Sequence, residues 1–339
     1  MIPPDEHAPL PHGGDLDAAR KQFPGAPEPF VDLSTGINPN SYPIPALSSG
    51  TFTRLPGAEE REWLAAAAAE AYAATSPCSV LPIPGTQILL SHVARLVPPG
   101  EAVVLATTYA EHARAAALAG HDVSQVTAVE ALGAADLAIA VNPNNPDGRV
   151  VQRDMLLATA ARLRARGGLL LVDEAFMDVG PEDVSLAPEV DAGNIVVLRS
   201  FGKFYGLSGL RLGFAIASKE IIARLAATLG PWPVSGPAIA IGTQALRDHA
   251  WRTRTRATLK QAASRLATLL AESRLTVAGG TDLFKLVRTE EASALHLHLA
   301  RNGILVRAFG EHPDLVRFGL PAAKVEWSRL GDALSRFGR

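Results

Sequence analysis

A lysine flanked by glycines and aromatic residues is the chemically most informative feature of the sequence. Lys203 lies in the stretch Ser200-Phe201-Gly202-Lys203-Phe204-Tyr205-Gly206, and Arg211 follows eight residues after it. A lysine in such surroundings can be partly desolvated, which lowers the pKa of its amine and favours formation of an imine. A lone lysine in a glycine-rich turn is more often an ordinary surface residue, so the interpretation depends on its companions.

Polar residues follow several apolar segments of the chain. Asp173 directly follows the apolar run 168–172, and Asn145 lies in the turn 142–148 that ends another run. A buried carboxylate can stay ionised beside a protonated pyridine nitrogen, and an amide can donate to a phenolic oxygen. Pro84-Gly85-Thr86-Gln87 opens a helix, whose free backbone N–H groups suit a phosphate. Because open α/β sheets bind ligands at the carboxyl ends of their strands, these residues are expected to meet there.

Alternating apolar and helix-length segments position these residues. The strands expected from short aliphatic runs are 103–106, 137–141, 169–172, 195–198 and 214–217. The helices expected between them include 110–119, 153–166 and 219–229. This alternation predicts an α/β fold with a mainly parallel sheet covered on both faces.

The pattern changes at the proline-rich stretch 231–237. A long helix is expected over 238–273, then strands 284–287 and 304–307 and a last helix from Ala322, which together form a smaller α+β domain. The first 30 residues, rich in Pro and Gly, are expected to be an arm with little secondary structure. The expected division is therefore 1–40 for the arm and a small-domain segment, 41–235 for the large domain and 236–339 for the small C-terminal domain.

Composition excludes several classes of protein. The chain has 339 residues, 32 Lys+Arg against 34 Asp+Glu, a net charge of −2, and 47% hydrophobic residues. It can bury a large core, and it lacks the basic excess of a nucleic-acid binder. The single cysteine, Cys78, excludes an intramolecular disulfide, and no segment reads as a signal peptide or a membrane span. We expect a cytoplasmic protein that binds neither nucleic acid nor membrane.

The order and spacing of these motifs resemble those of the fold-type I pyridoxal-phosphate enzymes of the class I/II aminotransferase superfamily, over nearly the whole chain. The resemblance implies pyridoxal 5′-phosphate as cofactor, a homodimer, Lys203 as the lysine that holds the cofactor, and Asp173 as partner of its ring nitrogen. It also implies that Asn145 donates to the cofactor's O3′ and that Tyr109 stacks on its ring. The remaining cofactor contacts implied are Gly85, Thr86, Gln87, Ser200 and Arg211.

Within that superfamily the chain is similar to the threonine-phosphate decarboxylase family. The resemblance is carried by the segments His12-Gly13-Gly14, 32–39, Asp173-Glu174-Ala175-Phe176 and 229–237. It implies a carbon–carbon lyase that converts L-threonine O-3-phosphate into (R)-1-aminopropan-2-ol O-2-phosphate and CO₂, for cobalamin biosynthesis. The small-molecule substrate, a phosphorylated amino acid, would be bound by His12, Gly13, Gly14, Gly36, Asn38, Asn145, Arg307 and Arg317. Guanidinium groups suit both anions; we expect Arg317 near the carboxylate and Arg307, with His12, near the phosphate.

Two departures and two alternatives remain. Leu55 stands where many relatives have a tyrosine that reaches the partner's cofactor phosphate, and Thr108 stands where a proline often precedes the stacking tyrosine, a change expected to loosen Tyr109 slightly. A histidinol-phosphate aminotransferase is the first alternative, but it would predict tyrosines at Leu55 and Phe176. A non-catalytic binding subunit is the second, and the intact set of Lys203, Asp173, Asn145 and Arg211 argues against it.

Three further features are interpreted as structural. His296 and His298 have no accompanying carboxylates or cysteines, so we expect exposed structural histidines and no metal site. Cys78 is expected to be a small packed residue rather than a nucleophile. Arg252, with two neighbouring arginines, is expected on the solvated face of the long helix.

Overall fold

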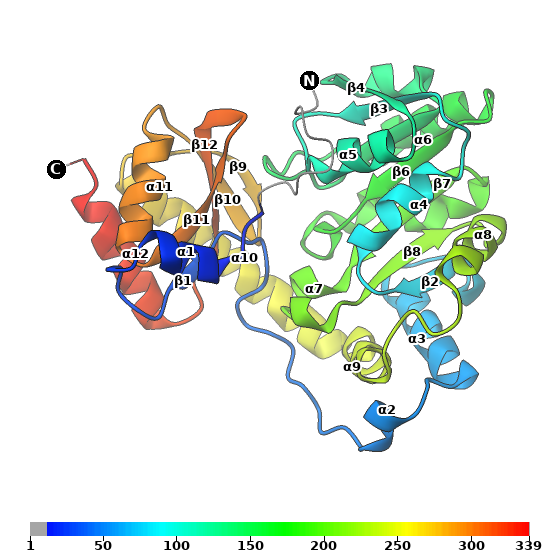
Figure 1. Cartoon of the computed structure of the whole chain (residues 1–339), viewed down its shortest axis with the longest axis horizontal. Helices are drawn as coiled ribbons and strands as arrows, with labels where there is room; N and C mark the ends of the chain where they lie inside the picture. Colours follow the sequence, from blue (N-terminus) through cyan, green and yellow to red (C-terminus); the bar gives the residue numbers. More distant parts are fainter. Residues whose placement is uncertain (1–11, 339) are drawn as a thin grey trace. The chain divides into compact units, whose positions relative to one another are not determined.

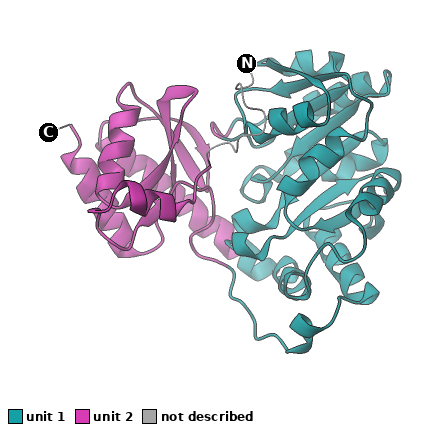
Figure 2. Cartoon of the chain, viewed as in Figure 1, with its two compact units in different colours: residues 1–9, 42–145, 149–252 teal, residues 10–41, 146–148, 253–339 magenta. Residues whose placement is uncertain are grey.

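The computed structural model describes residues 12–338, which form two compact units. Unit 1 comprises residues 42–145 and 149–252 of this range, and unit 2 comprises 12–41, 146–148 and 253–338 (Figure 2). Among these residues no helix is both long enough and apolar enough to cross a membrane.

Unit 1 is built on a seven-stranded sheet with the order β2-β8-β7-β6-β5-β3-β4 (Figure 1). Among its described strands, β8 runs in one direction and the other six run in the opposite direction. The strands are β2 (Val80–Ile83), β3 (Glu101–Leu105), β4 (Asp122–Val126), β5 (Leu137–Val141), β6 (Leu169–Asp173), β7 (Ile195–Ser200) and β8 (Gly213–Ala217). The mainly parallel sheet expected from the sequence is confirmed.

Helices cover both faces of this sheet because its central strands, β5, β6 and β7, are apolar over most of their length. On one face, side chains such as Ile139 and Leu171 form a core with Val93 of α4, Ala116 of α5 and Leu225 of α8. The alternate residues of these strands, whose side chains point to the other face, are also buried, and α6 packs against β6. The helices of unit 1 are α2 (Gly50–Thr53), α3 (Ala58–Ala71), α4 (Leu90–Ala94), α5 (Glu111–Leu118), α6 (Arg153–Arg164), α7 (Phe201–Phe204), α8 (Lys219–Leu229) and α9 (Gly236–Arg247).

Short 3₁₀ turns complete unit 1. They are η1 (Pro77–Ser79), η2 (Thr86–Leu89), η3 (Val129–Ala134), η4 (Met177–Val179), η5 (Glu182–Val184), η6 (Ala187–Ala192) and η7 (Ser208–Leu210). Lys203, expected in a loop, lies instead in the single turn of α7. The strands and helices expected from periodicity end within two residues of the observed bounds in unit 1.

Unit 2 contains a five-stranded sheet with the order β1-β11-β12-β10-β9. β1 pairs in parallel with β11, and the other pairs are antiparallel. Its strands are β1 (Val31–Leu33), β9 (Thr276–Thr281), β10 (Phe284–Arg288), β11 (Ile304–Phe309) and β12 (His312–Gly319). Its helices are α1 (Leu16–Gln22), α11 (Ala292–Arg301), α12 (Lys324–Arg336) and most of α10 (His249–Glu272), which begins in unit 1.

The N-terminal segment is more ordered than expected. The sequence predicted little secondary structure in the first 30 residues, but α1 lies there. Asp15 explains this helix, because its side chain accepts a hydrogen bond from the Ala18 N–H at 2.8 Å and so caps the first turn.

The expected long helix over 238–273 is two helices, α9 and α10. Asp248 separates them, since its side chain accepts a hydrogen bond from the Trp251 N–H at 2.9 Å and starts a new helix. The expected domain boundary after residue 235 also differs from the observed division, which assigns α9 to unit 1. α9 packs against α3, and a Cβ at Gly242 would lie 3.1 Å from the Leu64 side chain.

Candidate active site

The carboxyl edge of the seven-stranded sheet gathers residues from five strands. β2, β3, β5, β6 and β7 run in the same direction, so their C-terminal ends meet at one edge, and antiparallel β8 begins there. The expected cofactor residues at this edge are Gly85, Thr86 and Gln87 after β2, Tyr109 after β3, Asn145 after β5, Asp173 in β6, Ser200 in β7, Lys203 in α7 and Arg211 before β8.

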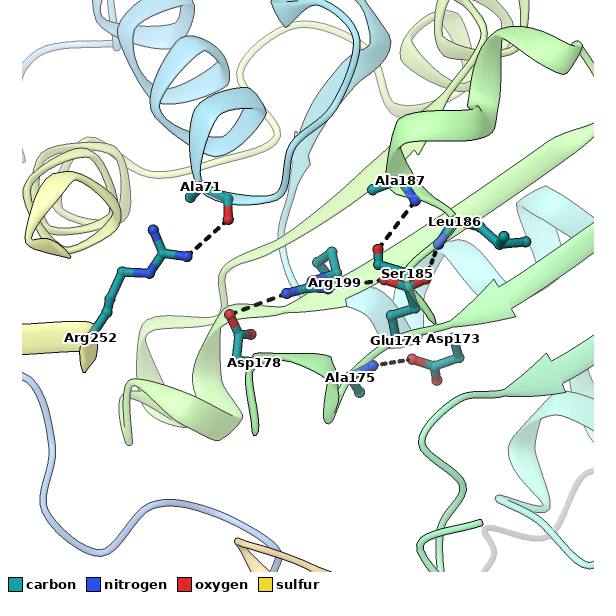
Figure 3. Close-up of polar contacts among 10 residues, drawn as sticks. All are labelled: Ala71, Asp173, Glu174, Ala175, Asp178, Ser185, Leu186, Ala187, Arg199 and Arg252. Carbon is teal, nitrogen blue, oxygen red and sulfur yellow. Dashed lines mark hydrogen bonds and ion pairs between the residues drawn. The ribbon is translucent and has the colours of Figure 1, made fainter. Parts of the chain in front are cut away.

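Asp173 is the last residue of β6 and is almost fully buried. Its Oδ2 lies 2.9 Å from Nε2 of His112, and its Oδ1 accepts a hydrogen bond from the Ala175 N–H at 3.0 Å (Figure 3). His112 is buried in α5, and its ring meets the Tyr109 ring edge-on. These contacts hold the carboxylate in one orientation at the carboxyl edge.

His112 was not among the residues singled out from the sequence. The available signal was its position three residues after Tyr109, since residues three apart share a face in a helical turn. The His112 N–H does donate to the Tyr109 carbonyl at 3.1 Å. The pairing of His112 with Asp173 joins positions 61 residues apart, so local pattern could not reveal it.

Tyr109 and Gln87 link the ends of β3 and β2. The Tyr109 hydroxyl donates to Gln87 Oε1 at 3.1 Å, and Gln87 Nε2 donates to Glu111 Oε2 at 3.1 Å. Each of the three side chains thus fixes the next one. The sequence predicted that Tyr109 and Gln87 would share a site, but it did not indicate Glu111.

The turn after β5 is tied to the segment that precedes Tyr109. Asn144 Nδ2 donates to the Thr107 carbonyl at 2.8 Å, and the Thr108 hydroxyl donates to Asn144 Oδ1 at 2.6 Å. The Thr108 hydroxyl thus adds a bond that a proline would lack, and this bond opposes the loosening of Tyr109 expected from the sequence. Asn145, next in the chain, is half-buried.

Lys203 is held on a turn whose other side chains are buried. The ring of Tyr205 stacks between Phe201, at a centroid distance of 4.2 Å, and Trp251, at 5.5 Å. Lys203 itself is only half-buried, and its Nζ lies 5.9 Å from the centroid of the Phe176 ring. The aromatic stack therefore fixes α7 and leaves the lysine partly accessible.

The Arg211 guanidinium lies against Gly85, a residue without a side chain. Arg211 and Gly85 both adopt the left-handed conformation, with φ of 53° and 85°. A Cβ at Gly85 would lie 2.7 Å from Arg211 Nη2, closer than real atoms approach. Arg211 Nη1 also donates to the Ser208 carbonyl at 3.2 Å. Glycine at position 85 therefore lets the Arg211 guanidinium lie directly against the backbone, next to the start of η2, where an anion can be bound.

A buried charged cluster, Glu174, Asp178 and Arg199, lies directly behind the edge. Arg199 Nη1 donates to Glu174 Oε2 at 2.9 Å and Nη2 donates to Asp178 Oδ1 at 3.2 Å (Figure 3). Burial raises the pKa of the Glu174 carboxyl although Arg199 opposes this. Burial acts to lower the pKa of Arg199, but Asp178 and Glu174 outweigh it, so that pKa lies above its ordinary value. Because Glu174 follows Asp173 and Arg199 precedes Ser200, the cluster holds two strand ends together.

Unit 2 carries two expected substrate residues on neighbouring strands. Arg307 in β11 pairs across the sheet with Arg317 in β12. Arg317 is 7% exposed, its Nη2 donates to the Ser34 carbonyl at 2.9 Å, and its guanidinium lies 5.1 Å from the Phe284 ring centroid. Burial and the nearby Arg307 lower the pKa of Arg317 to about 10, against the opposing effect of Asp32. Because burial and mutual repulsion disfavour the two adjacent positive charges, a bound anion would stabilise them.

The other expected substrate residues of unit 2 come from the segment around β1. The Gly14 N–H donates to Ser34 Oγ at 2.7 Å, and a Cβ at Gly13 would overlap the Ser34 carbonyl. The two glycines thus allow close packing on Ser34. The full set of expected substrate residues in this segment is His12, which is exposed, Gly13 and Gly14, and the buried Gly36 and Asn38.

Several structural interpretations of single residues are wrong. Cys78 is exposed rather than packed. Arg252 is buried and its Nη2 donates to the Ala71 carbonyl at 2.9 Å (Figure 3), because the first turn of α10 packs inside unit 1. His296 and His298 are half-buried in α11, where His298 Nε2 lies 2.8 Å from the Ala333 carbonyl. Within residues 12–338 no group of three His, Cys, Asp or Glu side chains could hold a metal ion.

Unit 1 also has a groove whose lining includes none of the expected cofactor residues of the carboxyl edge. It measures about 1000 Å³ and is lined by residues of α2, α3 and α9 and by the connection between α2 and α3. Two of its lining side chains are large, apolar and exposed: Leu55 at 67% and Trp63 at 48%. Leu55, at the position where a tyrosine was expected from the resemblance, therefore lines this groove.

Comparison with known proteins gives consistent matches over nearly the full length. Residues 30–329 match the family described as aminotransferase class I and II. A threonine-phosphate decarboxylase of Pseudomonas aeruginosa is 44% identical over 331 residues, covering 97% of this chain and 98% of that protein. One of a Sinorhizobium species is 42% identical over 332 residues, with the same two coverages of 97% and 98%.

Solved structures show the same fold. The structure of a histidinol-phosphate aminotransferase from Sinorhizobium meliloti, in complex with pyridoxal-5′-phosphate, matches with a TM-score of 0.78 at 22% identity. The match covers 98% of this chain and 96% of that chain. At this identity the likeness establishes the fold, a fold-type I α/β architecture, and not the activity.

Proposed function

The chain belongs to the aminotransferase class I and II family, and we propose that it is a pyridoxal-phosphate-dependent threonine-phosphate decarboxylase. The reaction converts L-threonine O-3-phosphate into (R)-1-aminopropan-2-ol O-2-phosphate and CO₂, a step that supplies cobalamin biosynthesis. The observation that carries the proposal is the identity with two threonine-phosphate decarboxylases along almost the entire chain. The fold alone does not decide, because aminotransferases share it.

The carboxyl-edge residues fit pyridoxal phosphate. When bound, this cofactor supplies an electron sink for the pair released as a bond to the substrate's Cα breaks. Asp173, buried and held by His112 and the Ala175 N–H, offers a carboxylate to the protonated ring nitrogen. Arg211, beside Gly85, offers a cation to the phosphate group.

We assign the remaining cofactor contacts by their position on the same edge. Lys203 holds the cofactor in the resting enzyme, Tyr109 covers its ring, and Asn145 donates to its phenolic oxygen. The hydroxyl and amide groups available to the phosphate are those of Thr86, Gln87 and Ser200. Support comes from the five strand ends that converge here and from the side-chain bonds that lock Tyr109 to Gln87.

The arginines of unit 2 bind the two anionic groups of the substrate. Arg317 takes the carboxylate, and Arg307 together with His12 takes the phosphate, with Gly13, Gly14, Gly36 and Asn38 completing the contacts. Burial and, after it, repulsion from Arg307 lower the pKa of Arg317 in the free protein, and an arriving anion offsets both effects. The phosphate is remote from the bond that breaks, so its binding energy can be used to orient the substrate.

Orientation separates decarboxylation from transamination. The outcome would depend on which bond to the substrate's Cα the protein holds in position for cleavage, and in a decarboxylase that must be the bond to the carboxylate. Binding of the phosphate by Arg307 and His12 rotates the substrate into this pose. After CO₂ leaves, Lys203 Nζ donates a proton to Cα, so the amino group stays on the product.

Release of CO₂ tests the proposal directly. Purified protein loaded with pyridoxal phosphate is given L-threonine O-3-phosphate without any keto acid, and CO₂ is measured over many turnovers. We expect sustained release, and we expect Lys203→Ala to abolish it while the protein stays folded, because the proton donor to Cα is gone.

A different outcome would identify the alternative. If no CO₂ forms and histidinol phosphate instead converts the cofactor to its amine form, with 2-oxoglutarate restoring it, the chain is an aminotransferase. The cofactor assignment would survive that result, but the roles given to Arg307 and His12 would not.

We further propose that the enzyme is a cytoplasmic homodimer. The groove lined by Leu55 and Trp63 exposes large apolar side chains that a second copy would cover. The single cysteine, Cys78, is exposed and unpaired with another cysteine, which suits a reducing compartment.

A further inference from the structure

Three residues next to Asn145 belong to a different unit from their neighbours in the chain. Residues 146–148 cluster with unit 2, whereas residues 42–145 and 149–252 form unit 1. Within unit 2 this segment is docked on β9, where the Gly280 N–H donates to the Asp147 carbonyl at 2.8 Å. The chain therefore leaves unit 1 directly after Asn145 and returns to it three residues later.

Glycines make this docking a contact of backbone with backbone. A Cβ at Gly279 would overlap the Asp147 carbonyl, and a Cβ at Gly148 would overlap the Gly280 carbonyl. Gly148 and Gly280 also have φ of 73° and 138°, which side chains rarely allow. We call the contact of residues 146–148 with Gly279 and Gly280 the glycine joint. The closest approaches in it are between glycine positions and backbone atoms, so no side chain lies between the two strands of chain to absorb a displacement.

The glycine joint lies in register with the arginines of unit 2. Gly279 pairs across the sheet with Leu286 of β10, and Leu286 pairs with Arg317 of β12. Arg317 in turn pairs with Arg307 of β11. A single cross-strand row therefore runs from the docking point to both residues that we assign to the substrate anions.

The flanks of the segment are fixed independently in unit 1. Asn144 is bonded to the Thr107 carbonyl and to the Thr108 hydroxyl. On the other side, Arg149 Nη2 donates to the Ala106 carbonyl at 2.9 Å. Asn145 is thus set between an anchor in unit 1 and the docked segment in unit 2.

We infer that Gly279 and Gly280 are positioning residues that, through the docked segment 146–148, set Asn145 against the cofactor's phenolic oxygen. The inference rests on the proposed function, because it uses the cofactor contact assigned to Asn145. By reciprocity, cofactor bound at Asn145 must stabilise the glycine joint as much as the joint stabilises that contact.

Hydrogen exchange of the unmodified protein tests this reciprocity. The exchange rate of the Gly280 amide is measured with and without bound pyridoxal phosphate, by NMR or by mass spectrometry of a peptide covering 278–283. We expect loading to slow this exchange by about 5- to 150-fold, the range of typical coupling between sites. The control is the turn between β11 and β12 at Gly310, in the same unit, whose exchange should not change.

A glycine variant gives a second, spectroscopic readout. Gly279→Ala displaces the docked segment, so Asn145 loses its donation to the phenolic oxygen. Because that donation stabilises the deprotonated, more negative form of the cofactor, the midpoint of its absorbance titration should rise by about one pH unit. Gly310→Ala is the matched control, since nothing lies within 4 Å of a Cβ there.

Different results would contradict the positioning role of Gly279 and Gly280 and the proposed binding of pyridoxal phosphate. Unchanged Gly280 exchange on loading, or a Gly279→Ala protein with lowered thermal stability and an unchanged absorbance midpoint, overturns the positioning role. If Gly279→Ala does not fold, the exchange measurement on the unmodified protein decides alone. Failure of the premise is recognised differently, because the protein would then not take up pyridoxal phosphate or show its absorbance at all.

Discussion

At the scale of single residues, neighbours decide what Asp173 can do. The carboxylate is buried at a strand end and keeps two hydrogen bonds, one with His112 and one from the Ala175 N–H. Asp173 and Lys203 could be singled out from the sequence because each belongs to a compact local motif. His112 could not, because its role depends on a helix and a strand meeting in the fold. Glu111, which orients Gln87, was missed for the same reason.

We expect His112→Phe to lower kcat by about 10- to 100-fold. A hydrogen bond to a charged group contributes about 1.5–3 kcal/mol, and its loss leaves Asp173 less able to pair with a protonated ring nitrogen. The measurement is steady-state CO₂ release together with the affinity for the cofactor.

His92→Phe provides the matched control for this substitution. His92 is a half-buried histidine of α4 whose Nδ1 lies 2.9 Å from the carbonyl oxygen of Ile88 in the preceding turn η2. An unchanged kcat in His112→Phe would remove His112 from the account of the site, whatever the control shows.

At the scale of elements, the charged cluster joins two strand ends. The Glu174 carboxylate also accepts hydrogen bonds from the Ser185 hydroxyl on Oε2 and from the Leu186 N–H on Oε1, both at 2.7 Å (Figure 3). Periodicity predicted the strands that carry Asp173 and Ser200 but not this link, since a buried arginine in an apolar strand carries no signal of its partners. The break between α9 and α10 was missed because the capping role of Asp248 competes with a helical pattern on both sides.

We expect Arg199→Met to destabilise the protein by about 3–5 kcal/mol at neutral pH. Removing the cation leaves the buried carboxylates Glu174 and Asp178 without the positive charge of Arg199. The free energy of unfolding is measured by urea denaturation. The control is Arg153→Met, which breaks a partly exposed ion pair with Glu189 and should cost about 0–1 kcal/mol. Equal small losses in both variants would contradict the role of the cluster.

The loss in Arg199→Met should also depend on pH. Arg199 lowers the pKa of Glu174, so its removal raises that pKa further above the ordinary 4.5. The folded variant then binds a proton that the unfolded chain does not hold, and this favours folding as the pH falls. We therefore expect the deficit in unfolding free energy to shrink as the pH falls from 7 towards 4.5.

At the scale of the whole molecule, alternation of apolar runs and helices predicted the large sheet, and the comparisons place it in a known architecture. The division into units was less predictable. The assignment of α9 to unit 1 depends on packing against α3, and the assignment of residues 146–148 to unit 2 depends on glycine contacts 130 residues away. Neither contact can be predicted from the local amino-acid composition of the segments involved.

We expect Trp63→Glu to convert the proposed homodimer into a monomer. A docking second copy would have to desolvate a charge placed in the groove, which is strongly unfavourable. Sedimentation velocity of both proteins measures the change. Val325→Glu is the control, because Val325 is a large apolar residue, 71% exposed, on α12 in the other unit. A dimer that survives Trp63→Glu would show that this groove is not the interface.

The parallel pairing of β1 with β11 has a consequence for synthesis of the chain. Val31 pairs with Ile304 and Leu33 with Val306, so the first strand of unit 2 is made long before its partner. At about 5–20 residues per second, the ribosome needs roughly 15–55 s to reach β11 after β1. Throughout that interval the large sheet can form while β1 waits without its partner strand. Val31 and Leu33, both buried in the finished fold, therefore lack their partner strand for most of translation, and molecular chaperones have time to bind them.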